Sequence, residues 1–517
     1  MNGMTSSNRN QLQISLESAV ALQRAGKLPE AEAIYRRVLA AVPRHPDALF
    51  LLGLILNATK RFAEAAEVFH RAIEVNPGAA KYYANLAVAV GAPGLGRIDE
   101  AIEIYRKALE LQPAEAALWS NLGNELRAAG RWQEAIDCYR RAVQLKPDFA
   151  DAYCNLGVSL QEVALQNAGS QGNNALAEVI ASYQKAVALD GNFALAHWNL
   201  GSALLLSGDY ERGLEEYEWR WRCQSFSQNV RLDPKRQWAC PEGVGNADVT
   251  GRTILVYSEQ GLGDSIQFAR YLPMLAARGA RVWLQCPASL QTLLGRCQGV
   301  ERAMAPGEDI PPYDWHVPML SLPFAFGTRV ATIPASIPYV KADAGQIEFW
   351  RQRLDAAAGG FPRVGLAWSG NPKNRMRYRS IRFDEFAAPL PTAIRERVRF
   401  VSLQKGEAAI QAASPPAGFK LLDFTDELRS FDDTAGLIAN LDLVISVDTA
   451  VAHLAGAMGK PTWVLLPVMC EWRWMLNHLD SPWYPTMRLF RQPSGGQWGP
   501  TVESIVAALE EHVSRGR

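Results

Sequence analysis

Residues 253–267 read TILVYSEQGLGDSIQ and decide the fold class of the C-terminal part of the chain. Thr253–Tyr257 is a short apolar run, which is typical of a buried parallel strand. Residues 265–277 have a helical pattern, so Gly261-Leu262-Gly263-Asp264 is predicted to be a strand-to-helix turn. A strand, a tight turn and a helix indicate the start of a doubly wound α/β domain.

The same alternation continues to the end of the chain. In a first set, residues 281–285 predict a second strand, and weaker strands are expected near His316 and Tyr339. A second set of strands is predicted, with helices between them, at residues 363–368, 399–403, 420–423, 442–446 and 462–466. We therefore expect two Rossmann-like halves, at residues 253–343 and 344–517, which bind ligands at the carboxyl ends of their strands.

The N-terminal part is repetitive. When its prolines are set in register, each following unit carries a small residue, then an alanine, and an aromatic residue four positions after that alanine. The prolines are Pro43, Pro77, Pro113 and Pro147, the small residues Gly53, Ala87, Gly123 and Gly157, and the aromatics Phe69, Tyr105 and Tyr139. This is the spacing of the 34-residue tetratricopeptide repeat, a pair of helices that stacks on the next pair.

Residues 1–225 are predicted to hold five or six such repeats. The first covers residues 12–45, and the last two begin at Ala150 and Ala194. An insertion at residues 167–174 is expected to lengthen the turn inside the fifth repeat. The sixth ends in residues 217–222, YEWRWR, which suit a helix that docks on another domain. Residues 226–252, rich in proline and glycine, are the predicted linker.

Composition excludes several classes of function. The chain has 517 residues, 53 Lys plus Arg and 53 Asp plus Glu, so no overall charge favours nucleic acid or an anionic membrane. Its seven cysteines are scattered and form no Cys-x-x-Cys pair, which argues against a zinc site or a disulfide framework. No run of 18 apolar residues and no signal peptide is found, so we expect a cytoplasmic protein without a membrane span.

Two segments together resemble a known enzyme family. They are residues 259–268, EQGLGDSIQF, followed by Pro273, and residues 446–455, SVDTAVAHLA. They resemble glycosyltransferase family 9, the ADP-heptose lipopolysaccharide heptosyltransferases, over residues 252–515. The second motif of that family is Asp-Thr-Gly-x-x-His, so Ala450 stands here where the family usually has glycine. With the repeats, the chain resembles bacterial proteins that couple a tetratricopeptide array to such a module.

The resemblance implies a GT-B fold, in which two Rossmann-like halves face each other. It implies a nucleotide-sugar donor held by the second half, an acceptor toward the first half, inversion at the anomeric carbon, no obligatory metal and no separate cofactor. Asp264 resembles the catalytic aspartate, against the alternative that it only caps a helix. The acceptor-side residues implied with it are Gln260, Gly261, Gly263 and Gln267.

The donor site is predicted from three strand ends. Asp448 and Thr449 follow a strand and open the helix 450–457, whose N-terminus can face a diphosphate, and His453 lies one turn later. The loop at residues 369–380 carries four cations, and Ser369, Asn371 and Arg379 are its favoured members. Gln404 and Glu407 follow the strand 399–403; the resemblance suggests Glu407 for the donor ribose, and the amide of Gln404 could contact the base.

Each donor residue has a structural alternative. Asp448 could be an ordinary helix cap, the basic loop a solvated surface, Glu407 a surface residue and His453 a core residue. Residues 423–426 could edge the nucleotide pocket, although a helix cap is the leading interpretation. Residues 471–474, EWRW, could stack on a base or shape the cleft, or be buried between the domains. No Asp-x-Asp motif occurs, so a metal-bound diphosphate is not supported.

Three functions remain open from the sequence. The first is an inverting glycosyltransferase whose repeats recruit an acceptor, with a protein or peptide as the leading candidate. The second is a protein O-glycosyltransferase of the repeat-linked O-GlcNAc transferase type. The third is a binding scaffold with an inactive transferase module, which Ala450 and the short first Rossmann half would suit. The sequence does not identify the sugar.

Overall fold

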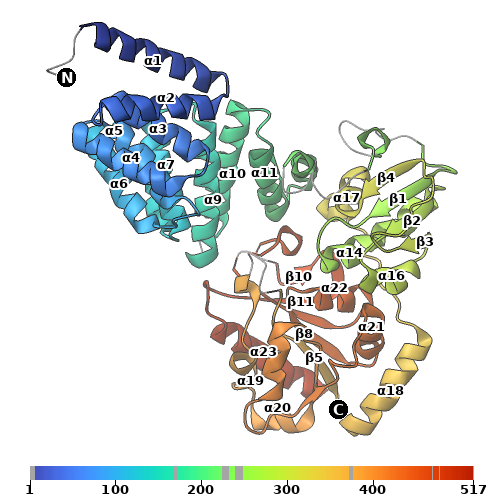
Figure 1. The fold of residues 1–517 in the computed structure, drawn as a ribbon. Coiled ribbons are helices and arrows are strands. Elements are labelled where there is room, and N and C mark those ends of the chain that lie inside the picture. Colours follow the sequence, from blue (N-terminus) through green and yellow to red (C-terminus); the bar gives the residue numbers. More distant parts are fainter. Residues whose placement is uncertain are drawn as a thin grey trace. The chain divides into compact units, whose positions relative to one another are not determined.

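The computed structural model describes residues 6–167, 172–223, 232–238, 248–371, 377–468, 470–476 and 478–515 (Figure 1). The chain forms two compact units. The first contains Met1–Val163 and Ala181–Gly191, and the second contains Ala164–Ile180 and Asn192–Arg517. The second unit therefore includes the end of the helical array together with the whole α/β part.

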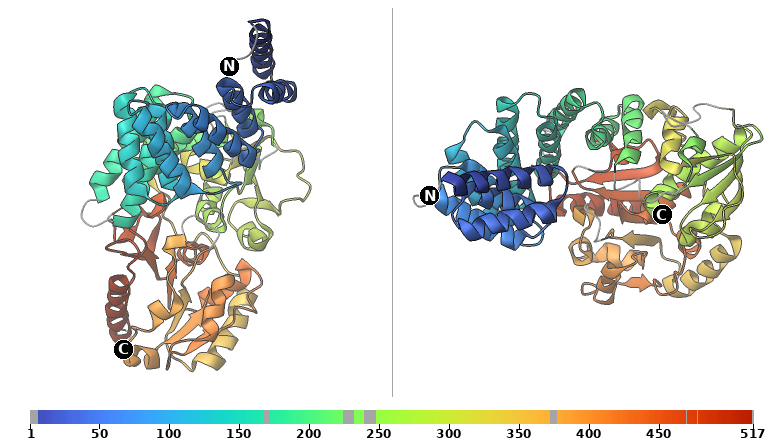
Figure 2. Two further views of the ribbon diagram at one scale, coloured as in Figure 1. Left: turned by 60° about the vertical axis from the view of Figure 1, so that its left-hand side comes forward. Right: turned by 45° about the horizontal axis from the view of Figure 1, so that its top comes forward.

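The first unit is a stack of helix pairs, seen from two further sides in Figure 2, and part of the fifth pair, in Ala164–Ile180, belongs to the second unit. The pairs are α1 (Ser6–Arg24) with α2 (Leu28–Ala41), α3 (Pro46–Ala58) with α4 (Phe62–Val75), α5 (Ala80–Gly91) with α6 (Ile98–Leu111), α7 (Ala116–Ala128) with α8 (Trp132–Leu145), and α9 (Ala150–Asn167) with α10 (Gly172–Leu189). The predicted tetratricopeptide repeats are confirmed.

In three repeats the small residue is a glycine that is required by the aromatic residue of its partner helix. A Cβ added to Gly53 would lie 2.5 Å from the Phe69 ring, one added to Gly123 would lie 2.8 Å from Tyr139, and one added to Gly157 would lie 2.6 Å from Tyr183. All three rings are fully buried. The two helices of a pair can pack closely only because these positions carry no side chain, which is the physical basis of the repeat pattern.

The fifth repeat differs from the others. Its helices α9 and α10 are each 18 residues long, whereas α7 and α8 have 13 and 14. The insertion was expected to lengthen the turn. In the described residues it lengthens the two helices, and residues 168–171 of the turn itself lie outside the described part of the chain.

The sixth helix pair, α11 (Ala194–Ser207) and α12 (Tyr210–Tyr217), continues into the short helix η1 (Glu218–Arg222) and packs on the α/β part. Trp483 Nε1 donates a hydrogen bond of 3.1 Å to the Tyr210 hydroxyl, and the Tyr217 ring lies 6.1 Å from that of Trp472. The division between the compact units thus falls inside the array, because the second unit takes Ala164–Ile180 and continues from Asn192. Residues 224–231 and 239–247 of the predicted linker region lie outside the described residues.

The first Rossmann-like half has a parallel sheet in the order β3-β2-β1-β4. Its strands are β1 (Thr253–Tyr257), β2 (Arg281–Gln285), β3 (Val300–Met304) and β4 (Trp315–Pro318), and its main helices are α14 (Leu262–Phe268), α15 (Leu272–Ala277) and α16 (Ala288–Gly295). The strand predicted near Tyr339 is wrong, because this residue lies in a loop whose N–H donates to the carbonyl of Ala457. Strand β3 was missed because its sequence, VERAM, is half-polar at the sheet edge.

The second half has a seven-stranded sheet in the order β10-β11-β9-β8-β5-β6-β7, parallel except for the β10–β11 pair. Its strands are β5 (Arg363–Ala367), β6 (Arg399–Ser402), β7 (Leu421–Asp423), β8 (Leu443–Val447), β9 (Thr462–Leu466), β10 (Asp480–Ser481) and β11 (Tyr484–Arg491). Its helices include α18 (Ala344–Ala358), α19 (Phe383–Ala387), α20 (Thr392–Arg397), α21 (Phe431–Ala439), α22 (Ala450–Ala457) and α23 (Gly499–Arg515).

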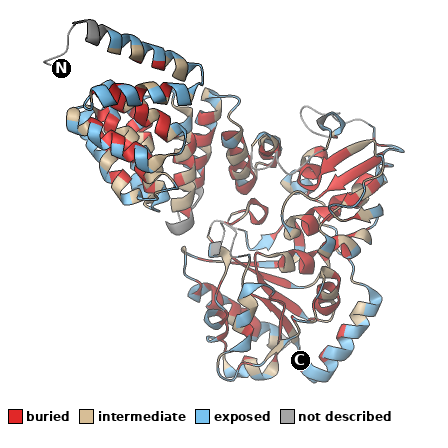
Figure 3. Ribbon diagram, in the orientation of Figure 1, coloured by how far each residue is buried: buried red, intermediate tan, exposed pale blue. Residues whose placement is uncertain are grey.

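The central strands of both sheets are buried, as Figure 3 shows in red. Burial on both faces is the condition under which strands read as continuous apolar runs, which is why β1, β8 and β9 were recognisable in the sequence. The array followed by two Rossmann-like sheets confirms the predicted fold class. None of the described helices combines the length and the apolar character that crossing a bilayer requires.

Candidate active site

A cleft of about 940 Å³ is lined by residues of both Rossmann-like halves. One wall is the turn between β1 and α14, and the other walls are the segments that follow β5, β6 and β8. The predicted site residues that line it are Gln260, Gly261, Gly263, Asp264, Ser369, Asn371, Arg379, Gln404, Glu407, Asp448, Thr449 and His453. Segments far apart in sequence therefore meet at the carboxyl ends of the strands, as expected for this kind of sheet.

Gln267 is the exception among the predicted residues. It does not line the cleft, its side chain is fully buried, and neither polar atom of its amide has a hydrogen-bond partner among the described residues. The structure thus places Gln267 behind the cleft wall, and its acceptor-side role stays a prediction. Only the first turn of α14 reaches the cleft, and the helix is enclosed from Ser265 onward.

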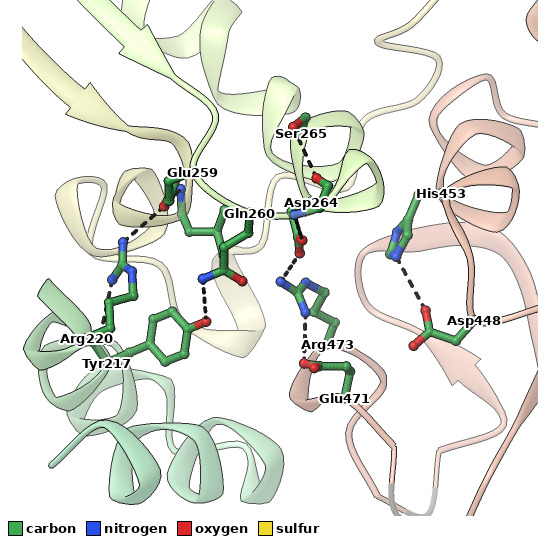
Figure 4. Close-up of polar contacts among 12 residues, drawn as sticks. Tyr217, Arg220, Glu259, Gln260, Asp264, Ser265, Asp448, His453, Glu471 and Arg473 are labelled. Carbon is green, nitrogen blue, oxygen red and sulfur yellow. Dashed lines mark hydrogen bonds and ion pairs between the residues drawn. The ribbon is translucent and has the colours of Figure 1, made fainter. Parts of the chain in front are cut away.

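Asp264 caps a helix and also lines the cleft. Helix α14 begins at Leu262, earlier than predicted, so Asp264 is its third residue and accepts a hydrogen bond of 2.8 Å from the Gly261 N–H through Oδ2. Its other oxygen, Oδ1, forms an ion pair with Arg473 Nη2 from the second half (Figure 4). The carboxylate therefore closes a helix cap with one oxygen and faces the cleft with the other.

Gly263 sets how closely the two halves approach. A Cβ at this position would lie 2.7 Å from Cδ2 of His453 and 3.5 Å from the Cα of Ala450. The first turns of α14 and α22 pack against each other here, so a larger residue would push the two walls of the cleft apart. Residue 450, where the family motif usually has glycine, is alanine. The close approach of α14 and α22 is made possible here by Gly263 instead.

Asp448 is a buried anchor for two cleft residues. Its side chain is 5% exposed; Oδ2 lies 3.4 Å from Arg379 Nη1, and Oδ1 lies 3.7 Å from His453 Nε2. Burial would raise the pKa of this carboxyl, but its contact with His453 and the charge of Arg379 outweigh burial and lower the pKa to about 2. Asp448 is therefore an anion that holds Arg379, and it cannot itself attract a diphosphate.

His453 is buried, as the structural alternative suggested, and it also lines the cleft. Its Nδ1 lies 3.0 Å from the Tyr484 hydroxyl, and its ring stacks on Trp474 with centroids 5.2 Å apart. These contacts fix the imidazole in place, with Nε2 toward Asp448 (Figure 4).

The N-terminus of α22 is open to the cleft. Thr449 is its N-cap residue, but its side chain accepts no hydrogen bond from the first turn and lies instead 3.0 Å from the Ser446 hydroxyl. Thr449, Ala450 and Val451 all line the cleft. Uncapped N–H groups at the positive end of a helix dipole favour an anion at this wall.

Gln404 is a positioning residue, contrary to its predicted contact with a base. Its Oε1 accepts hydrogen bonds from the N–H groups of Trp368 and Ser369 at 2.9 and 2.8 Å, and its Nε2 donates to the carbonyls of Ser369 and Lys405 at 3.0 and 2.9 Å. This uses the full capacity of the amide. Gln404 thus ties the ends of β5 and β6 together beneath the cleft.

The predicted basic loop is described only at its two ends, because residues 372–376 lie outside the described part. Ser369 donates to the Gly370 carbonyl, Asn371 is exposed at the rim, and Arg379 reaches back across Gly370, where a Cβ would lie 2.8 Å from its Nε. Glu407 is exposed on the opposite rim. Ser369, Asn371 and Arg379 all line the cleft, and Arg379 is the cation among them.

Arg473 is the main cleft residue that the sequence did not single out. Residues 471–474 were expected to stack on a base, to shape the cleft or to be buried between the domains; Trp472 and Trp474 are buried, and Arg473 and Glu471 line the cleft. Arg473 Nη1 lies 2.9 Å from Glu471 Oε2, and burial raises the pKa of that carboxyl. In EWRW the two tryptophans alternate with two charged residues. This pattern indicated that the tryptophans would be buried while Glu471 and Arg473 reach the cleft.

The turn that carries Asp264 contacts the end of the helical array, namely Tyr217 of α12 and Arg220 of η1 (Figure 4). Gln260 Nε2 donates a hydrogen bond of 3.1 Å to the Tyr217 hydroxyl, and Arg220 Nη2 lies 3.3 Å from Glu259 Oε1. Arg220 is fully buried and also contacts Glu218 at 2.6 Å. This confirms the docking predicted from the aromatic and basic ending of the array.

Glu259 gives the folded protein a defined pH dependence. Burial raises the pKa of its carboxyl from the usual 4.5 to about 7, against the lowering effect of Arg220. Because the folded state prefers the protonated form, its contribution to stability is complete below about pH 4.5 and is lost as the pH rises through about 7.

We therefore expect the free energy of unfolding of the wild type to fall between pH 5 and 8, by up to about 1.4 kcal/mol per pH unit through this group. Glu259→Gln should flatten that dependence, as measured by chemical denaturation at several pH values. Glu301→Gln, at an exposed position paired with Arg281, is the control and should keep the wild-type slope. An unchanged slope in Glu259→Gln would show that Glu259 is ionised throughout.

Comparison with known proteins agrees with this architecture. Residues 16–80 and 61–116 match the tetratricopeptide repeat family, and residues 123–163 match a second family described as TPR repeat. Residues 426–465 match glycosyltransferase family 9 (heptosyltransferase), a segment that contains Asp448 and His453 but not Asp264.

One curated relative is the protein FlbA of Caulobacter vibrioides, 28% identical over 330 residues, which are 60% of this chain and 54% of that protein. The chain thus spans about half the length of this relative. Among solved structures, MamA is similar with 21% identity, a TM-score of 0.30 and coverage of 35% of this chain and 93% of that one. TTC0263, a TPR protein of Thermus thermophilus, is similar with 21% identity, a TM-score of 0.30 and coverage of 38% and 99%.

Proposed function

We propose that this chain, a tetratricopeptide-repeat protein with a glycosyltransferase family 9 segment, is an inverting, metal-independent glycosyltransferase. It would move a sugar from a nucleotide-diphosphate donor to an acceptor recruited by the repeats, with a polypeptide as the acceptor class. The observation that carries the proposal is the cleft itself, which is lined by Asp264 of the first half and by Arg379 and the open N-terminus of α22 in the second half.

The chemistry assigns one task to each wall. Asp264 would take the proton of an acceptor hydroxyl while its oxygen attacks the anomeric carbon, and the bond from that carbon to the diphosphate oxygen breaks with its electron pair going to the diphosphate. A single displacement from the face opposite the leaving group inverts the configuration. The departing anion would be stabilised by Arg379 and by the helix dipole of α22.

Metal independence is supported by the charges of the cleft. The guanidinium groups of Arg379 and Arg473 line it, and the N–H groups of α22 add a positive dipole. Guanidinium groups bind phosphate oxygens in a bidentate manner and can neutralise a diphosphate without a cation.

The repeats support recruitment of a polypeptide. Stacked helix pairs form an extended surface that can hold an unfolded segment, and each pair adds contacts along it. The sixth pair is part of the same compact unit as the cleft and contacts the turn of Asp264 through Tyr217 and Gln260.

The donor site is tested with Arg379→Ala. Nucleoside diphosphates and their sugar conjugates, tested one by one, are titrated into the full-length chain by calorimetry. The variant should lose about 1.5 to 3 kcal/mol of binding free energy with the best ligand, because a charge-assisted hydrogen bond to phosphate is removed.

Arg382→Ala is the matched control, since Arg382 is exposed, pairs with Asp384 and does not line the cleft. Equal affinity in Arg379→Ala and wild type would place the diphosphate elsewhere. Tight binding of a nucleotide sugar with no hydrolysis and no transfer to any protein would favour the scaffold function instead.

A further inference from the structure

Among the described residues, Arg473 is the one arginine of the second half whose guanidinium pairs with Asp264, the proposed base in the first half. Its side chain is 6% exposed, Nη2 pairs with Asp264 and Nη1 lies 2.9 Å from Glu471, while Nε has no partner among the described residues. The guanidinium also lies 4.8 Å from the Trp472 ring centroid and 5.5 Å from that of Phe268. Glu471 and the two rings hold it at the cleft wall independently of Asp264.

This pairing opposes catalysis by Asp264. The guanidinium occupies Oδ1, the carboxylate oxygen that is not used by the helix cap, so an acceptor hydroxyl has to displace Arg473 before it can donate its proton to this oxygen. Burial would lower the pKa of Arg473, and the charges of Asp264 and Glu471 outweigh burial and raise it, so the guanidinium stays charged. The cleft therefore keeps a permanent cation, and one of the two carboxylates that neutralise this cation is the proposed base itself.

A diphosphate is the ligand class that can replace Asp264. Arg473 and Arg379 both line the cleft, and each is paired with a carboxylate, Asp264 and Asp448 respectively. Phosphate oxygens accept from guanidinium in the same bidentate manner as a carboxylate and carry more charge. Asp264 also keeps its hydrogen bond from the Gly261 N–H through the other oxygen, so it can lose Arg473 without losing its place.

We propose that Arg473 is a further donor-binding residue, for which Asp264 and the donor diphosphate compete. Donor binding then transfers Arg473 from Asp264 to the diphosphate and frees the base, so that the donor binds before the acceptor is activated. This inference rests on the proposed function for the identity of the ligand. The competing interpretation is a structural ion pair that only ties the two halves together.

The two interpretations differ in the effect of removing Asp264's charge. The probe is the nucleoside diphosphate, chosen from ADP, GDP, UDP and CDP, that binds the full-length wild type most tightly by calorimetry. If Asp264 competes for Arg473, Asp264→Asn should bind it roughly 3- to 10-fold more tightly, because the guanidinium is released. Asn keeps the size of Asp and an oxygen for the Gly261 N–H, so the cap is retained.

A double variant, Asp264→Asn with Arg473→Gln, distinguishes the release of Arg473 from the general effect of removing a negative charge from the cleft. Arg473→Gln should bind the probe roughly 10-fold or more weakly, and adding Asp264→Asn to it should give no further tightening. If the Gln variant unfolds below the wild type in a thermal scan, Arg473→Met, which is uncharged and keeps an apolar stem against Trp472 and Phe268, serves the same comparison.

The outcomes are distinct. Unchanged or weaker binding in Asp264→Asn overturns the inference, as does tightening that persists when Arg473 is replaced. If the wild type binds none of the four probes, both the inference and the proposed donor site fail. If the expected affinities are found but no sugar is transferred to a protein, the inference stands and only the proposed transferase activity is contradicted.

Discussion

Asp264→Asn should reduce the rate of sugar transfer by about 100-fold or more while the protein stays folded. The acceptor hydroxyl must lose its proton as it attacks, and an amide cannot accept it. The fold is preserved because Asn retains an oxygen for the Gly261 N–H, the only hydrogen bond that Asp264 makes inside its own helix among the described contacts. The measurement is the initial rate of transfer with saturating donor, with thermal unfolding of the same sample.

Asp384→Asn is the matched control, because Asp384 is exposed and pairs with Arg382 outside the cleft. It should transfer sugar at the wild-type rate. If Asp264→Asn also turned over near the wild-type rate and lost only about 1 kcal/mol of stability, Asp264 would be a helix-cap residue and the base would have to be sought elsewhere.

Removing residues 1–225 should abolish folding of the α/β part, whereas removing residues 1–149 should not. The longer deletion takes away α11, α12 and η1, which cover the aromatic rings of Trp472 and Trp483. It also removes Arg220 and leaves the buried carboxyl of Glu259 without its cation. Exposing a large buried apolar side chain to water costs about 1.5 to 3 kcal/mol, so uncovering several of them removes a large fraction of a domain's stability.

The two truncations are compared by solubility, by cooperative unfolding and by nucleoside diphosphate binding. The chain 150–517 should be folded and bind the donor, but lose transfer to the natural acceptor because the first four repeats are absent. Full-rate transfer by this chain would exclude recruitment by those repeats. A folded chain 226–517 would show that the last helix pair is dispensable for the α/β part.

The strands that could be predicted from the sequence include the fully buried β1, β8 and β9, and also β2, whose residues alternate between buried and more exposed. Thr253–Tyr257, Arg281–Gln285 and Thr462–Leu466 have the predicted bounds, and helix Ala450–Ala457 does as well. Strand β3 was not predicted because two adjacent charged residues, Glu301 and Arg302, interrupt its apolar residues at the sheet edge. Strand β11 was also missed, and a strand was wrongly assigned near Tyr339.

The positions of most cleft residues could be predicted from the strand ends in the sequence. The contacts that these residues make could not be predicted. Gln404 follows β6 as expected, yet its amide is used by the backbone of Trp368 and Ser369. Asp448 opens α22 as expected, yet it anchors Arg379 and His453. Gln267 belongs to the correct helix but lies on its enclosed side. Position along a strand or helix is a local property, whereas hydrogen-bond partners depend on what the rest of the chain brings nearby.

The sequence by itself determined the repeats, the two Rossmann-like halves and the turn that presents Asp264, because the spacing of apolar, small and glycine residues is a short-range property. Only the tertiary structure decided that Arg473 faces Asp264 across 209 residues of sequence, and that Tyr217 holds Gln260 from the last repeat. Such contacts form only when the two sheets and the last helix pair pack together. The energies of burial and charge that favour them depend on both partners, so neither segment's sequence alone predicts which distant residue it will contact.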